Sequence, residues 1–192
     1  QRYLFERHQI AQNAGLLGIR ALVVLQLIRE NAVRKAHLPD FSNPPLDEVV
    51  LGVQFAQIPD YSSINANAIW SLFKDDFPKV IEQPMLEPRF ETFGGANPQP
   101  SFQFQVGPGP VGSRLWFLSS DENHLLQFQS DRFLLNWRKR PKPQAYPRFE
   151  EIARRFEESM SALEGHLETT FRHQMDVNQA EVSYMNIIPV TE

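Results

Sequence analysis

The segment from Arg114 to Arg138 constrains the fold more than any other part of the chain. Three apolar or alternating stretches, residues 114–119, 125–129 and 132–138, are separated only by the short polar breaks "SDEN" and "SD". Serine, aspartate and asparagine favour turns because their side chains bond nearby backbone groups. Connections this short can join only antiparallel neighbours. The segment therefore predicts a three-stranded antiparallel meander, with Phe133, Leu135 and Trp137 on one face of its last strand.

Periodic patterns predict the elements around this meander. Apolar residues recur every three or four positions from Phe149 to Phe171, which is typical of an amphipathic helix. A second helix is expected from Ser62 or Ser63 to Phe77, before Pro78. Further strands are expected at 47–58, 89–93, 102–106 and 180–190.

The predicted order is (α)-β-α-β-β-β-β-β-α-β. It indicates a two-layer α+β fold, in which a mostly antiparallel sheet is covered on one face by helices. In the helix beginning at Ser62 or Ser63, Ile64, Ala68, Leu72 and Phe73 fall near helical spacing, with Trp70 beside them.

The first 36 residues are interpreted separately from the rest. The apolar run 14–28 contains Arg20 and Gln26, and at fifteen residues it is shorter than the roughly twenty that a membrane-spanning helix needs. It predicts an amphipathic or buried helix over 10–33, with a membrane-surface segment or an extension foreign to the domain as alternatives. The proline-rich stretch 37–48 then marks a boundary. We expect an N-terminal helical extension, 1–36, and a single α+β domain, 37–192.

Charge and composition limit the classes of function. The formal net charge is −4, whereas a dedicated nucleic-acid binder is usually basic overall. The 192 residues include no cysteine, which excludes disulfides, thiolate nucleophiles and cysteine-based metal sites. No secretory signal and no membrane span are evident, so the predicted location is the cytoplasm.

Several stretches together carry a resemblance. They are "LPDFSNPPLDEVVLGVQF", "IWSLFKDDFPKVIEQP", "RLWFLSSDENHLLQFQSDRFLLNWRK", "YPRFEEIARRFEE" and "VSYMNII", of which "QSDRFLLNWR" and "YMN" are the most specific. The chain resembles, over about residues 38–188, a sporadically distributed prokaryotic family of uncharacterised proteins. The resemblance implies that a C-terminal portion present in other members is missing here. It implies no activity and no catalytic residues.

Known catalytic and cofactor motifs are not found. The "GPGPVG" stretch resembles a phosphate loop only superficially, because Pro108 and Pro110 lack the amides that cradle phosphate. His166 and His173 could share a helix face as a metal pair, but two exposed histidines near a helix end are the better explanation. No metal and no cofactor is predicted.

Polar residues inside the predicted strands are the first candidate site. Gln54, Gln127, Gln129, Asn136 and Asn186 lie in otherwise apolar or aromatic segments. Buried amides must find hydrogen-bond partners. Three interpretations stay open: the solvent face of an antiparallel sheet, a surface for a ligand or partner, and a catalytic site.

The stretch from Arg132 to Arg148 is the second candidate site, since it holds six basic residues and no acidic one. Cations beside Trp137 and Tyr146 are typical of single-stranded nucleic-acid binding. Trp137, however, is in phase with the core residues of its strand, and prolines stiffen the loop. A solvated loop, a protein-binding loop and a nucleic-acid site therefore remain as interpretations. The basic residues concerned are Arg132, Arg138, Lys139, Arg140, Lys142 and Arg148.

The leading functional hypothesis is a non-enzymatic interaction domain that binds a protein partner or a second copy of itself. One alternative is binding of nucleic acid or another anion through 132–148. The other is a small-molecule or enzyme pocket on the polar face of the sheet.

Overall fold

The computed structural model describes residues 4–7, 41, 43–87, 113–140 and 145–188. Within these ranges, seven strands form one sheet in the order β1-β7-β2-β6-β5-β4-β3, with every neighbouring pair antiparallel. The strands are β1 (Leu4–Arg7), β2 (Leu46–Phe55), β3 (Lys79–Pro84), β4 (Ser113–Leu118), β5 (His124–Gln129), β6 (Arg132–Arg138) and β7 (Val177–Asn186).

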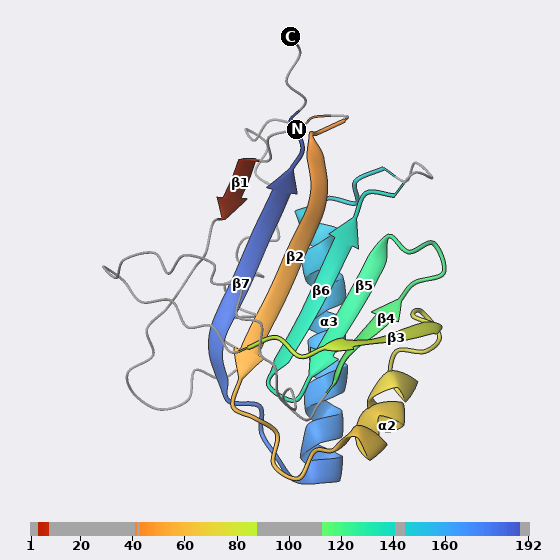
Figure 1. Cartoon of the computed structure of the whole chain (residues 1–192), viewed down its shortest axis with the longest axis vertical. Coiled ribbons are helices and arrows are strands. Elements are labelled where there is room, and N and C mark those ends of the chain that lie inside the picture. Colours follow the sequence, from red (N-terminus) through yellow and green to blue (C-terminus); the bar gives the residue numbers. More distant parts are fainter. Residues whose placement is uncertain (1–3, 8–40, 42, 88–112, 141–144, 189–192) are drawn as a thin grey trace, which may run out of the picture.

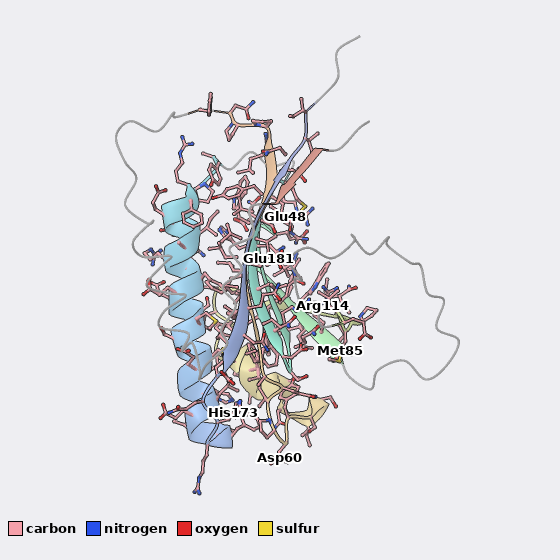
Figure 2. All side chains as sticks on the ribbon, turned by 90° about the vertical axis from the view of Figure 1, so that its left-hand side faces the viewer. Glu48, Asp60, Met85, Arg114, His173 and Glu181 are labelled. Carbon is pink, nitrogen blue, oxygen red and sulfur yellow. The ribbon has the colours of Figure 1, made fainter. Side chains whose placement is uncertain are left out.

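The long helix α3 (Phe149–Phe171) lies across one face of the sheet, as Figures 1 and 2 both show. The α+β fold, the antiparallel meander β4–β5–β6 and the bounds of α3 are therefore confirmed. The two-residue turn Ser130–Asp131 sets the register of the last hairpin, in which Gln129 lies opposite Arg132.

The core forms between α3 and the sheet face that it covers. Phe133, Leu135 and Trp137 of β6 are all at most 2% exposed, which confirms Trp137 as a core residue. Phe156 of α3 stacks on Phe133 with ring centroids 6.1 Å apart, and Tyr146 packs against Trp137 at 5.1 Å. Side chains alternate across a strand, so every second residue of β2, β4, β5 and β6 faces the opposite side of the sheet.

The helix predicted over 62–77 is much shorter in the structure. A 3-10 turn (Ser63–Asn65) leads into α2 (Ala66–Ser71), and only non-helical turns follow. Of the residues at helical spacing, Ile64 and Leu72 are 86% and 37% exposed, so they do not share one buried face with Phe73. The Trp70 indole N–H donates to the Phe77 carbonyl at 3.0 Å, which stabilises a compact turn where the helix was expected to continue.

The strand β3 was not predicted from the sequence. It is the outermost strand next to β4, and most of its side chains are exposed, so it lacks the buried alternating pattern of an inner strand. Its last residue is Pro84, which an edge strand tolerates because its backbone need not donate to a neighbour.

Other bounds differ less. The strand predicted at 180–190 runs from Val177 to Asn186, and β1 pairs with it. The helix predicted at 10–33 and the strands at 89–93 and 102–106 lie outside the described residues.

Candidate ligand-binding site

The sheet face opposite α3 carries a pocket of about 460 Å³. This volume lies within the range of roughly 300–1,000 Å³ that is usual for small-molecule sites. Its floor comes from β2, β5, β6 and β7, and Arg114 of β4 lies at its side. Met85, Leu86 and Glu87, which follow β3, cross this face, and Figure 2 shows Met85 and Arg114 on the side of the sheet away from α3.

A row of one arginine and three glutamines crosses the sheet at the pocket. Arg132 of β6 lies opposite Gln129 of β5 on one side and Gln54 of β2 on the other, and Gln54 lies opposite Gln179 of β7. The Arg132 guanidinium donates to Gln54 Oε1 at 2.6 Å. The adjacent row has an apolar centre, where Gly52 lies opposite Leu134.

A chain of hydrogen bonds links four neighbouring strands on the same face. Arg114 Nη1 and Trp116 Nε1 both donate to Gln127 Oε1 at 3.0 Å, and Gln127 Nε2 donates to Asn136 Oδ1 at 2.8 Å. Asn136 Nδ2 then donates to Glu48 Oε1 at 2.7 Å. Burial raises the pKa of Glu48, although the hydrogen bond from Asn136 opposes that rise. The amides of Gln127 and Asn136 are therefore satisfied by their neighbours.

The segment Met85–Glu87 is held on the sheet by two of the predicted site residues. The Gln129 side chain accepts from the Leu86 N–H and donates to the Leu86 carbonyl, both at 3.0 Å. Arg132 also donates to the Glu87 carbonyl at 3.2 Å. Gln129 thus pairs with this backbone as a neighbouring strand would, which explains why an amide only 1% exposed occurs in the strand.

Arg114 and Arg132 are the two positively charged groups that line the pocket. Neither forms an ion pair with a carboxylate among the described residues. Arg114 Nε is buried, and no described residue accepts a hydrogen bond from it. Burial lowers the pKa of Arg114, and repulsion from Arg132 lowers it further. A guanidinium nevertheless stays protonated in proteins, so the pocket keeps two positive charges.

The structure brings together four of the five predicted amides. Gln54, Gln127, Gln129 and Asn136 lie on the pocket face and are at most 6% exposed, so they do not form an open solvent face. Asn186 does not join them. Asn186 is two residues from Tyr184 and therefore lies on the same face of β7. Tyr184 packs on Phe149 of α3, so this face is the one opposite the pocket.

Sequence reasoning missed Arg114 and Glu181 as pocket residues. Arg114 alternates in phase with Trp116, which could have suggested a polar position on the second face. Glu181 depends on the pairing of β7 with β2, which joins residues about 130 positions apart and leaves no local signal.

The basic residues around 132–148 do not form one surface. Arg132 enters the pocket, whereas Arg138 lies over the Trp116 ring at 5.9 Å. Lys139 donates to Asn43 Oδ1, and Arg140 donates to the Glu122 carbonyl. Arg148 donates to the Phe41 carbonyl, while Lys142 lies outside the described residues.

The remaining polar groups are a turn residue, Asp121, and the half-buried His166 and His173. Asp121 accepts from Ser119 and from the Asn123 N–H, as expected of a turn residue. His166 contacts Thr170, and among the described residues no three His, Asp or Glu side chains gather as metal ligands would. No helix in the described ranges has the length and apolar character required to cross a membrane.

The fold and the pocket together define an α+β domain with a small polar site on the open face of its sheet. No protein-family model, curated protein or solved structure matches this chain.

Proposed function

We propose that this domain binds a small organic anion in the pocket opposite α3, and that Arg114 and Arg132 hold its carboxylate group. The supporting observation is the pair of guanidinium groups that line the pocket without a carboxylate partner among the described residues. A guanidinium offers a planar fork of donors that matches a carboxylate in a bidentate geometry.

The surrounding amides support this role. Gln127 accepts from Arg114, and Gln54 accepts from Arg132, so each arginine is oriented by a neutral oxygen. A neutral acceptor fixes the side chain but leaves its positive charge available to a ligand. A carboxylate at the same position would neutralise that charge.

The indole N–H of Trp116 provides a direct test, because it donates to the same Gln127 oxygen as Arg114. Titration of the protein with succinate should shift the Trp116 indole resonance in a ¹H–¹⁵N spectrum, with Trp116→Phe identifying the peak. Arg114→Gln and Arg132→Gln should each weaken succinate about tenfold or more, since loss of a charge-assisted hydrogen bond costs about 1.5–3 kcal/mol.

Arg154→Gln is the matched control, since Arg154 is an exposed arginine of α3 that pairs with Glu151 and Glu158. It should leave the titration unchanged. Equal weakening in all three variants, or succinate binding that survives loss of both pocket arginines, would contradict the proposal.

The sequence-based expectation of self-association remains a prediction, and β3 is the place to test it. Val80 and Ile81 on this outermost described strand are each 44% exposed. An open strand edge can pair with the edge of a second copy. Sedimentation velocity over a range of concentrations should then show a dimer that Ile81→Lys disrupts. A monomer at every concentration would exclude this use of the edge. The resemblance to a prokaryotic family likewise stays a prediction.

A further inference from the structure

We infer that the ligand of this pocket is a zwitterion the size of an amino acid or dipeptide. Its carboxylate would lie on Arg114 and Arg132, and its ammonium group at Glu181. The inference rests on the proposed function and adds the chemical class of the ligand.

Groups of opposite charge line the pocket. Glu181 of β7 lines the same pocket as the two arginines, but it forms no ion pair with them or with any other described cation. Its carboxylate oxygen Oε1 accepts a hydrogen bond from the Ser183 hydroxyl at 2.8 Å. Opposite charges therefore share one pocket without contacting each other, and a ligand with both charges would complement both.

The separation of these charges along the sheet limits the length of the ligand. Arg132 lies opposite Gln54, and Glu181 lies opposite Gly52, with β2 between β6 and β7. Two strand spacings of about 4.8 Å and two residues of about 3.4 Å place their Cα atoms about 12 Å apart. The Arg132 side chain reaches toward β2, so the remaining gap is shorter. A dipeptide spans about 7 Å when extended, which makes it the upper limit of what we expect to bind.

The pocket floor between the charges includes apolar residues. Gly52 and Leu134 line the pocket there and offer no side-chain polar group, and the neighbouring Gln54 already accepts from Arg132. The carbon skeleton of an amino acid or dipeptide would cover this apolar floor. A dicarboxylate such as succinate would instead direct its second negative charge toward Glu181, so it should bind through one carboxylate and more weakly than a zwitterion of the same length.

The test compares alanylleucine with its N-acetyl and C-amide derivatives by isothermal titration calorimetry. We expect N-acetylation and C-amidation each to weaken binding by about tenfold, because each removes one charge pair. In Glu181→Gln, the free and N-acetylated dipeptides should bind equally, while the effect of C-amidation persists. Glu168→Gln is the control, since Glu168 is an exposed carboxylate of α3, on the opposite side of the sheet from the pocket.

Each outcome separates this inference from the proposed function. Equal binding of the free and N-acetylated dipeptides to the unmodified protein would overturn the zwitterion, although an effect of Arg114→Gln would still support carboxylate binding. If neither compound binds and succinate binding does not depend on Arg114, both proposals fail. Thermal unfolding followed by circular dichroism verifies that the Glu181→Gln variant is folded.

Discussion

Replacing Gly52 with alanine tests the packing of the pocket floor. A β-carbon at this position would overlap Leu134 Cδ2 on the opposite strand, whereas Leu134 Cγ would be 3.4 Å away, an ordinary contact. Only the end of the leucine side chain therefore has to move. Because Leu134 borders the pocket, the open direction for that movement is into the ligand space.

The magnitude follows from the cost of moving this one side chain. A forced, non-ideal rotamer costs about 0.5–1.5 kcal/mol, and overpacking costs about 1–3 kcal/mol. We expect Gly52→Ala to lower the free energy of unfolding by about 1–2 kcal/mol, as measured by urea denaturation with tryptophan fluorescence. Succinate binding should weaken in parallel because the displaced methyl group occupies pocket volume.

A double-mutant cycle measures whether the residues at positions 52 and 134 interact. Leu134→Ala alone should cost about 2–3 kcal/mol, because Leu134 is 6% exposed and borders an open pocket. In Gly52→Ala/Leu134→Ala, the overlap disappears, so the double variant should be no less stable than Leu134→Ala. Losses that add to within about 0.5 kcal/mol would show that the two residues do not interact, and would refute the argument.

Three further predictions concern other parts of the domain. Burial raises the pKa of Glu48, so the free energy of unfolding should fall as pH rises from the carboxyl's ordinary range through the raised pKa. In Glu48→Gln, urea denaturation between pH 4 and 8 should no longer show this fall. Phe156→Ala should cost about 3–5 kcal/mol in the same assay, against less than about 0.5 kcal/mol for the exposed Glu158→Ala. Gln129→Leu should release the Leu86 backbone, seen as faster amide exchange at Leu86; unchanged exchange would mean that the side chain does not hold this segment.

The meander and α3 could be predicted because their signals are local. The two short turns between β4, β5 and β6 impose antiparallel pairing, and the alternation of β6 fixes which residues enter the core. The 23-residue helix α3 repeats its apolar positions often enough to define both of its ends. In contrast, β3 has exposed residues on both faces, so its sequence carries no pattern of burial.

The candidate site was predicted only in part because it depends on register between distant strands. The amides of Gln127 and Asn136 could be recognised as polar residues in apolar strands. Glu48 lies beside Asn136 only because β2 pairs with β6. Glu181 lies opposite Gly52 only because β2 pairs with β7 on its other side. Asn186 carried the same sequence signal as the other amides, but its position in the alternation of β7 places it on the opposite face.

The buried amides and the arginines on this face have different roles, and the hydrogen bonds distinguish them. Gln127 and Gln129 use both the oxygen and the nitrogen of their amides in contacts within the protein. Such a satisfied network fixes one arrangement of the strands and has little left to offer a ligand. Arg114 keeps a buried donor without a partner, and neither it nor Arg132 has a described counter-ion. If a ligand binds here, the arginines should therefore determine its affinity, while substitution of the amides should act mainly through stability.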